Sequence, residues 1–370
     1  MSNHKKARIT ATLALFTITA GIAACGGSSG GASTSETRYT GPGSKWDISL
    51  SSDASFSVTR RENTTAPVDM TVTGTYVRQN NGFVKLTVNS ATDSANNMLS
   101  SPANGDTAWA LDVPGYAFML RPMDANNEQL IPMVVSGGCP SSNLSSNWVT
   151  VKTAAGNDAT DANSDFFGTF TFDATAQTGE LPSRYSLVNP TSNVGAFTVG
   201  SGTCNEGIMD ISNGIMYLAS NGAIVRIGTD TPQDASDDSY IFALDQKAIS
   251  NLSNISGTYA GMLFDDNAIS GEKILPVSMT CDAAGNCTGA LLGTDLTSQL
   301  GGTVSLDFST STPDTPSTGW ITGTITDTSS GNISCMFDID AAGTGKKIAS
   351  CVGQSPDDNT KLFNVLLVSI

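Results

Sequence analysis

The sequence has 370 residues, and its 18 Lys and Arg against 34 Asp and Glu give a formal net charge of −16. The single histidine is His4, in a segment that we expect to be removed from the mature protein. Catalysis by Ser-His-Asp or Cys-His groups and zinc sites with histidine ligands are therefore excluded. The acidic balance also argues against nucleic acid as a partner.

The N-terminus has the pattern of a secretory leader. Lys5, Lys6 and Arg8 form a basic segment, and residues 9–24 form an apolar stretch behind it. A basic segment followed by a short apolar one is typical of a signal peptide. We predict a signal peptide over residues 1–24.

The leader ends in Ile22-Ala23-Ala24-Cys25, which resembles the lipobox of bacterial lipoproteins. In that family the cysteine is lipidated and becomes the first residue of the mature chain. The resemblance implies that acyl chains on Cys25 anchor the protein in a membrane. Gly26, in place of the aspartate that retains such proteins in the inner membrane, implies the outer membrane, with the body facing the periplasm or the cell surface. Residues 25–38 are rich in Gly and Ser, which predicts a flexible tether.

Six cysteines follow Cys25, and an even number in an exported chain predicts disulfides. The gap between the third and fourth fits neither a C-x-x-C redox motif nor a zinc site. Sequence alone does not choose the connectivity. The six candidates are Cys139, Cys204, Cys281, Cys287, Cys335 and Cys351.

Local spacing nevertheless favours one pairing. Cys335 and Cys351 are equidistant from the turn-like segment around Gly343, so a hairpin there places them opposite each other. Cys281 and Cys287 flank another turn-like segment and are expected to form a local bond. The other two cysteines then remain as the third pair.

Strand-like alternation runs through the chain, in short segments bounded by Gly, Asn, Asp, Ser and Pro. Clear examples are residues 46–50, 68–77, 83–88 and 320–325. Helical periodicity is confined to short turns near 94–99 and 244–252. The sequence therefore predicts an all-β fold with antiparallel sheets.

A polar segment near residues 246–256 separates two strand-rich regions, which predicts an N-terminal β domain over 39–250 and a C-terminal one over 251–370. The first is large enough for a sandwich or for two packed sheets. The second accommodates eight strands, and its opening Gly257-Thr258-Tyr259 loosely resembles the first strand of lipocalin-like calycin barrels. We expect a small antiparallel barrel or sandwich there. The eight strands are expected near 257–264, 273–279, 286–292, 302–308, 319–325, 332–338, 346–352 and 361–369.

Asp161, Asn163 and Asp165 have the alternating oxygen ligands of a calcium loop. The motif departs from an EF-hand because Phe166 and Phe172 stand where Gly and Glu belong. A solvated turn is the alternative interpretation. The same two interpretations apply to a second acidic cluster, Asp230, Asp234, Asp237 and Asp238.

These features predict a non-catalytic outer-membrane lipoprotein that binds an envelope or extracellular partner or has a structural role, with no cofactor other than calcium. One alternative is a calycin-like carrier of a small apolar ligand, which requires a cavity inside the C-terminal barrel. A second is a glycoside hydrolase, which requires two carboxylates that face each other. The six glutamates, Glu36, Glu62, Glu128, Glu180, Glu206 and Glu272, form no recognisable pair.

Overall fold

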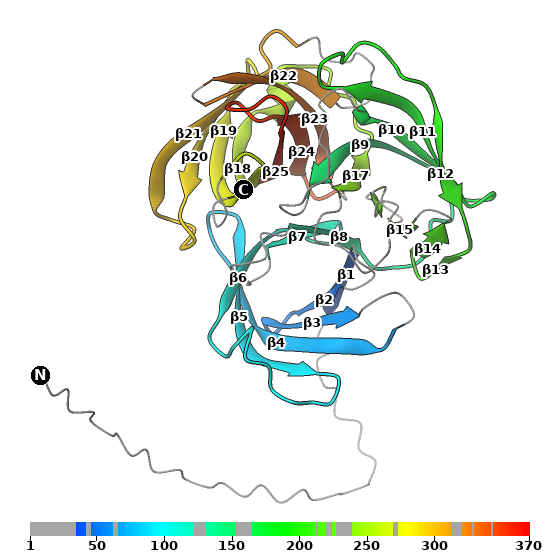
Figure 1. Cartoon of the computed structure of the whole chain (residues 1–370), viewed down its shortest axis with the longest axis vertical. Coiled ribbons are helices and arrows are strands. Elements are labelled where there is room, and N and C mark those ends of the chain that lie inside the picture. Colours follow the sequence, from blue (N-terminus) through cyan, green and yellow to red (C-terminus); the bar gives the residue numbers. More distant parts are fainter. Residues whose placement is uncertain are drawn as a thin grey trace, which may run out of the picture. The chain divides into compact units, whose positions relative to one another are not determined.

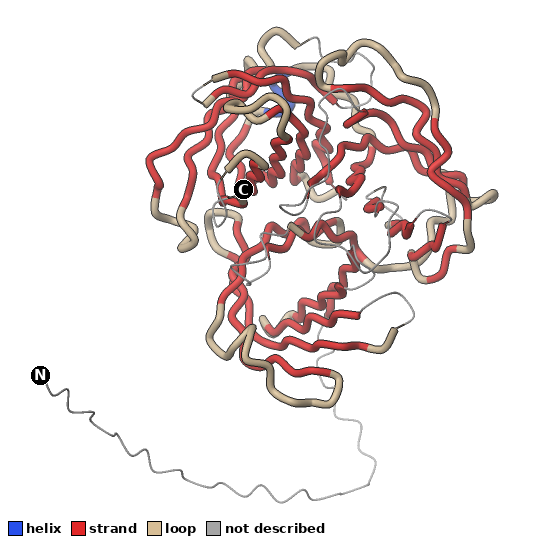
Figure 2. The backbone as a smooth tube through the Cα atoms, viewed as in Figure 1, coloured by secondary structure: helices blue, strands red, loops and turns tan. Residues whose placement is uncertain are grey.

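The computed structural model describes residues 35–41, 46–61, 66–121, 130–152, 165–211, 214–219, 222, 224–226, 239–268, 273–311, 320–327, 329–341 and 343–370. These residues form three antiparallel sheets, and the helix among them is one short 3-10 turn, η1 (Leu252–Ile255) (Figures 1 and 2). The predicted all-β fold class is confirmed.

The first sheet is a closed eight-stranded barrel, here called the N-terminal barrel and coloured blue to teal in Figure 1. Each strand pairs with the next along the chain, and β1 closes the barrel through Tyr39 opposite Val135. Its strands are β1 (Glu36–Gly41), β2 (Trp46–Ser51), β3 (Ser55–Arg61), β4 (Val68–Arg78), β5 (Phe83–Asp93), β6 (Thr107–Val113), β7 (Ala117–Arg121) and β8 (Ile131–Val135).

The second sheet, here called the middle sheet, has nine strands in the order β12-β11-β10-β9-β17-β16-β15-β14-β13. The sequence left open whether residues 39–250 form one sandwich or two sheets, and the structure forms two. The strands are β9 (Leu144–Lys152), β10 (Asp165–Asp173), β11 (Thr178–Ser186), β12 (Phe197–Ser201), β13 (Cys204–Asn205), β14 (Ile208–Ile211), β15 (Gly214–Leu218), β16 (Ile224–Arg226) and β17 (Ser239–Asp245).

The middle sheet curls until its two edges meet. Only Gly202 and Thr203 separate β12 at one edge from β13 at the other, so the edges must lie together. A Cβ on Gly202 would lie 2.1 Å from the carbonyl oxygen of Asp210 on β14, and only glycine permits this approach. The disulfide between Cys139 and Cys204 ties β13 to the segment between β8 and β9.

The third sheet, the C-terminal barrel, is closed by the pairing of β18 with β25. Its eight strands agree with the eight expected from the sequence, and of the two expected architectures, barrel and sandwich, the structure forms the barrel. They are β18 (Gly257–Asp265), β19 (Ile274–Cys281), β20 (Asn286–Leu292), β21 (Gln299–Asp307), β22 (Trp320–Thr326), β23 (Ser330–Ala341), β24 (Lys346–Gln354) and β25 (Leu362–Ser369).

Side chains from alternate strand positions fill both barrels. In the C-terminal barrel, Tyr259, Phe337 and Phe363 belong to one buried cluster drawn from this barrel and the segment before it. Two disulfides, Cys281–Cys287 and Cys335–Cys351, lie in the same cluster, each between directly opposed residues of neighbouring strands. Ile249 and Ile255 also join it, so the segment around η1 packs onto the barrel core. A separate cluster fills the N-terminal barrel in the same way.

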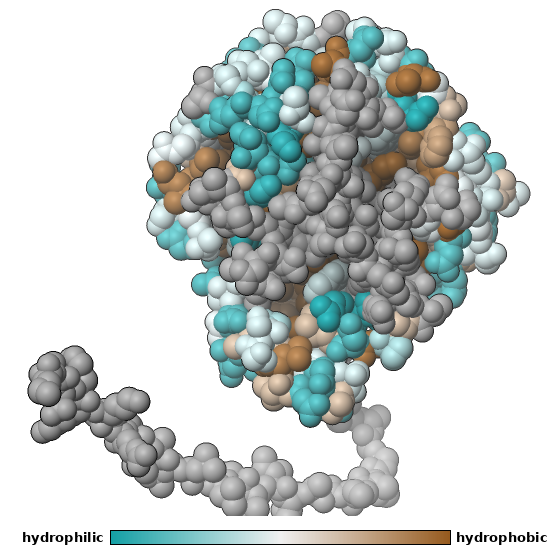
Figure 3. Space-filling model, viewed as in Figure 1, coloured by the Kyte–Doolittle hydropathy of each residue, from teal (hydrophilic) through white to brown (hydrophobic). Residues whose placement is uncertain are grey.

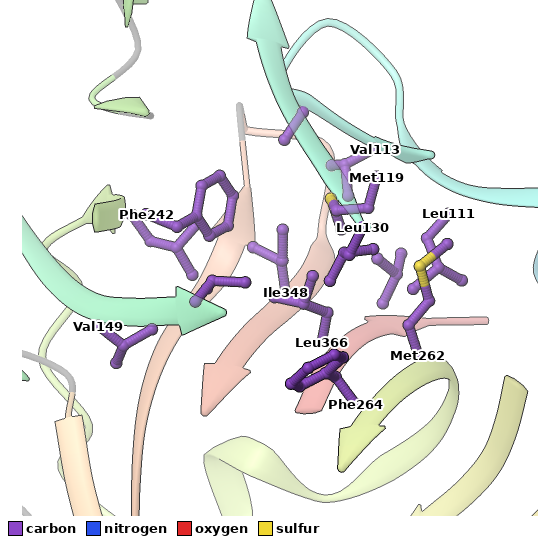
Figure 4. Close-up of a cluster of buried hydrophobic side chains, with 14 of the residues drawn as sticks. Leu111, Val113, Met119, Leu130, Val149, Phe242, Met262, Phe264, Ile348 and Leu366 are labelled. Atoms are coloured by element: carbon purple, nitrogen blue, oxygen red, sulfur yellow. The ribbon is translucent and has the colours of Figure 1, made fainter. Parts of the chain in front are cut away.

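The outward faces of strands from all three sheets build another apolar core, here called the shared core (Figure 4). Strand β25 is buried from Leu362 to Val368, because its alternate side chains point into the barrel and into the shared core. Strands β7 and β8 are buried on both faces in the same manner. Labelled members are Leu111, Val113, Met119 and Leu130 of the N-terminal barrel, Val149 and Phe242 of the middle sheet, and Met262, Phe264, Ile348 and Leu366 of the C-terminal barrel.

Truncation of a side chain in the shared core should destabilise the whole folded body. Leu366→Ala removes a fully buried side chain, and we expect the free energy of unfolding to fall by about 2–5 kcal/mol. Urea denaturation followed by tryptophan fluorescence measures this. Leu300→Ala is the matched control, because Leu300 is 55% exposed and its truncation should change stability by less than about 0.5 kcal/mol. Equal effects of the two substitutions would contradict the shared core.

Candidate functional site

A group of titratable residues, of which Tyr116 and Asp338 are buried, lies where the three sheets meet and is here called the junction cluster. It consists of Tyr116 from the N-terminal barrel, Asp245 and Lys247 at the end of β17, and Asp338 and Asp340 on β23. Titratable groups perturbed by burial and by one another are typical of functional sites, although structural networks share this property. The contacts of each group decide whether this cluster is a functional site or a structural network.

Tyr116 lies in the turn between β6 and β7 and is fully buried in the shared core. Its backbone N–H donates to the carbonyl of Val113, and its carbonyl accepts from the N–H of Val135, each at 2.9 Å. The hydroxyl oxygen accepts a hydrogen bond of 2.9 Å from the N–H of Asp245. Burial raises the pKa of the Tyr116 hydroxyl, and the charge of Asp338 raises it further. The tyrosine therefore stays protonated and links two sheets.

Asp338 faces away from the interior of the C-terminal barrel and is completely buried. Its Oδ1 accepts a hydrogen bond of 3.0 Å from the N–H of Asp340, whereas Oδ2 accepts none from the described residues. Burial is the largest cause that raises the pKa of this carboxyl group, and the like charge of Asp245 adds to it. The hydrogen bond from the N–H of Asp340 opposes this rise in pKa most, and the charge of Lys247 opposes it further.

Lys247 is the cation of the cluster, and its Nζ lies 2.7 Å from Oδ2 of Asp245. The hydrogen bond to Asp245 raises the pKa of Lys247, as do the charges of Asp338 and Asp340. Both partners of the ion pair are partly exposed. A catalytic acid must contact its substrate, and the fully buried Asp338 is out of reach. The junction cluster thus fits a structural link between sheets better than an active site.

A second polar network, formed by buried Tyr39 and Asp112 with the partly exposed Arg78, lies in the N-terminal barrel. The hydroxyl of Tyr39 donates to Oδ1 of Asp112 at 2.7 Å, and the guanidinium group of Arg78 pairs with Oδ2 of the same carboxylate. Arg78 also lies over the ring of Tyr76, at 5.0 Å from the ring centre. Burial raises the pKa of Asp112, while the Tyr39 hydrogen bond and the Arg78 charge oppose the rise. The carboxylate is therefore occupied by two partners of its own barrel.

A third acidic group lies at the end of β18. Asp266 is buried and pairs with Lys273, whose Nζ lies 3.2 Å from Oδ1 and 2.9 Å from the backbone oxygen of Asp266. Burial raises the pKa of the neighbouring Asp265, and the charges of Asp357 and Asp266 add to this. Asp357 itself is exposed. Among the described residues, no group of three or more His, Cys, Asp or Glu side chains is suited to hold a metal ion.

Several residues predicted from the sequence lie outside the described ranges. These include Cys25, Asp161 and Asn163, together with the second acidic cluster. Asp165 begins β10, but its side chain is not described, so the calcium loop stays a hypothesis. The described glutamates, Glu36, Glu180 and Glu206, are all exposed.

The six cysteines form three bonds within the described structure. They join Cys139 to Cys204, Cys281 to Cys287 and Cys335 to Cys351, which are the pairs favoured by the spacing. The first bond is partly exposed, and the other two are buried in the C-terminal barrel. All three are expected in an oxidising compartment.

Sequence reasoning did not single out Tyr116 or Asp338. Their sequence separation is long, and neither lies in a motif. One available signal was the loss of alternation in 117–120 and 362–368, where nearly continuous apolar residues indicate burial on both faces of a strand. Such strands show that sheets pack together, but they do not show which polar residues meet between the sheets.

No protein-family model and no curated protein matches the chain. Among solved structures, it is similar to isotype 1 transferrin binding protein B of serogroup B Neisseria meningitidis, with a TM-score of 0.27 and 11% identity over 88% of this chain and 65% of that one. It is also similar to a protein of unknown function of the DUF3598 family from Nostoc punctiforme, with a TM-score of 0.19 and 8% identity over 91% and 94%. Both TM-scores are low, so function is argued below from this chain's own residues. The described residues include no helix long and apolar enough to cross a lipid bilayer.

Asp338→Asn should stabilise the protein at neutral pH. Because burial raises the pKa of Asp338 above its value in the unfolded chain, the ionised carboxylate destabilises the folded state above that raised pKa. The stability gained by the substitution should therefore shrink as the pH falls through the raised pKa and vanish near pH ~3. Urea denaturation across this pH range measures the difference.

The exposed Asp327→Asn is the control, because it also removes one negative charge. If the two variants gave the same pH profile, the effect would belong to net charge and not to burial at the junction. A D338N protein that is less stable than the wild type at neutral pH would contradict the prediction.

Proposed function

We propose that this chain is a lipid-anchored outer-membrane lipoprotein whose folded body binds a partner protein at the cell envelope and has no catalytic role. The observation that carries this proposal is the filling of both barrels. Tyr39 and Phe118 occupy the N-terminal barrel, and Tyr259, Phe337 and Phe363 occupy the C-terminal one. A carrier of a small apolar ligand needs an open interior of several hundred Å³, whereas buried aromatic side chains occupy these interiors. Binding is therefore assigned to the outer surface.

The buried carboxylates also favour a non-catalytic role. Asp112 pairs with Arg78, and Asp266 pairs with Lys273. Asp338 is buried beyond the reach of a substrate. A glycosidase needs two carboxylates that face a sugar, with one of them free to exchange a proton. The contacts of these groups instead support the structure around them.

The disulfides and the surface are consistent with an exported binding protein. One disulfide ties the middle sheet to the segment before it, and two lie within the C-terminal barrel, which suits a body that works outside the cytoplasm. On the face shown in Figure 3, apolar residues form small separate groups among hydrophilic ones. A contact on such a surface combines apolar and polar groups, as in reversible protein interfaces.

Cys25→Ser tests the anchor. In cells that express the full chain, we expect the wild-type protein to incorporate an alkyne-labelled fatty acid and to fractionate with the outer membrane. The variant should lose both properties, because the acyl chains need the Cys25 sulfur. Cys139→Ser is the matched control, since it removes a cysteine that lies in a disulfide. A C25S protein that still sediments with membranes would contradict the anchor.

Binding of an apolar dye distinguishes the proposed surface binding from carriage of a small ligand. Because the barrel interiors are filled, the exported C25S protein should show no saturable, one-to-one binding of an anilinonaphthalene dye, and native mass spectrometry should show the mass of the chain alone. Stoichiometric dye binding, or a lipid that co-purifies, would instead support the carrier alternative.

A further inference from the structure

The disulfide between Cys139 and Cys204 is the most accessible of the three bonds. Both of its cysteines are partly exposed, whereas the four cysteines of the C-terminal barrel are at most 3% exposed. Thiol–disulfide exchange begins when a thiolate attacks one sulfur of the bond, so its rate depends on access to that sulfur. A reductant that meets the folded protein therefore reaches this bond first.

The chain around the bond leaves room for a reductant. Gly137 and Gly138 precede Cys139, and a Cβ added at either glycine would meet no described atom within 4 Å apart from its chain neighbours. At the other end of the bond, Thr203 and Asn205 flank Cys204, and both are exposed. The bond is therefore open to approach from the side of the two glycines.

The two bonds of the C-terminal barrel lack such access. Cys281 lies directly opposite Cys287, and Cys335 lies directly opposite Cys351, on neighbouring strands. All four side chains belong to the core of that barrel. A thiolate reaches them when the barrel opens, and the open form of a packed core is rarely populated. These two bonds are internal references for the accessible one.

The accessible bond holds a short edge strand in place. Strand β13 consists of Cys204 and Asn205 and forms one edge of the middle sheet. Its ladder with β14 has two residue pairs, and the N–H of Cys204 also donates to Oε1 of Gln177 at 3.0 Å. Because its ladder is so short, β13 depends on the covalent link to Cys139 more than a strand of ordinary length would.

The cores of the molecule do not depend on this bond. Neither Cys139 nor Cys204 belongs to the shared core or to the core of either barrel. Cys204 packs, partly buried, against the separate apolar cluster of the middle sheet. Loss of the bond therefore loosens β13 and leaves the packing of the barrels unchanged.

We propose that Cys139–Cys204 is a site of reversible thiol–disulfide exchange, at which a dithiol opens the bond and releases β13 while both barrels stay folded. One thiolate of the dithiol attacks a sulfur of the bond, and the other cysteine leaves as a thiolate. The second thiolate of the dithiol then attacks the mixed disulfide and frees the remaining cysteine. The dithiol loses two electrons and becomes a disulfide, and each proton that it gives up is taken up by one of the two cysteines. The inference does not depend on the proposed binding role.

Timed reduction of the folded full chain tests this site. Dithiothreitol is added to the chain in mild detergent, free thiols are trapped with iodoacetamide at intervals, and peptide mass spectrometry gives the labelling of each cysteine. We expect Cys139 and Cys204 to be labelled at least about tenfold faster than the four barrel cysteines, because the barrel bonds react through rare opening. The circular dichroism spectrum should not change, and oxidised glutathione should restore the bond once dithiothreitol is removed.

Three results of this experiment would overturn the site. They are equal labelling rates at all three bonds, faster labelling in the C-terminal barrel, and labelling that begins only as the circular dichroism signal is lost. A reduced bond that does not form again would overturn its reversibility.

The double variant Cys139→Ser with Cys204→Ser tests the release of β13, since it removes the bond without a reductant. Hydrogen exchange followed by mass spectrometry should show a loss of protection in the peptide that contains residues 203–206, whereas peptides of β24 and β25 should exchange as in the wild type. Cys335→Ser with Cys351→Ser is the matched control, and its effect should lie in β23 and β24 instead. Unchanged protection at β13, or loss of protection across both barrels in the first variant, would overturn the proposed release.

Discussion

The folded body depends on strands that are buried on both faces. Strand β25 places Val365 and Leu367 inside its own barrel and Leu366 and Val368 in the shared core. Strands β7 and β8 of the N-terminal barrel are likewise buried on both faces. A barrel that stood alone would expose its outer apolar side chains to water, at about 25 cal/mol for each Å². Packing three sheets around one core removes that exposure, so each sheet needs the other two.

This packing buries polar groups between the sheets, where water cannot form hydrogen bonds with them. Nδ2 of Asn364 donates to the carbonyl of Thr150 in the middle sheet at 2.8 Å and to that of Cys351 at 3.1 Å. Tyr116 accepts from Asp245 in the same region. A buried hydrogen bond of this kind adds little net stability, but the wrong alignment of two sheets leaves its groups unpaired, at roughly 1–3 kcal/mol each. The polar contacts therefore select one arrangement of sheets that apolar packing alone would not distinguish.

The same packing bears on the proposed binding role. Because each barrel is filled inside and covered over part of its outer face, the surface open to a partner lies away from the shared core. What stays accessible is the set of loops and edges away from the shared core, among which the β11–β12 connection carries exposed Val188, Val194 and Phe197. A rigid β framework that displays such a segment is a common arrangement in binding proteins.

The sequence by itself determined the local structure. Alternation and turn residues predicted the eight strands of the C-terminal barrel, and the turn-like segment around Gly343 predicted that Cys335 and Cys351 lie opposite each other. These features depend on neighbours a few residues apart, so a single sequence contains the signal. It also contains the segment at Cys25 that resembles a lipobox, a short motif whose recognition does not depend on the fold.

Only the tertiary structure decided which faces of the strands are covered and which polar residues meet. Tyr116, Asp245 and Asp338 are far apart in the chain and come together because three sheets turn their outer faces to one core. The sequence also could not predict that Phe197 is exposed and Phe242 is buried, since both are phenylalanines in strand-like segments. Alternation along a strand shows that it has two faces, but the packing of one sheet on another determines what each face contacts.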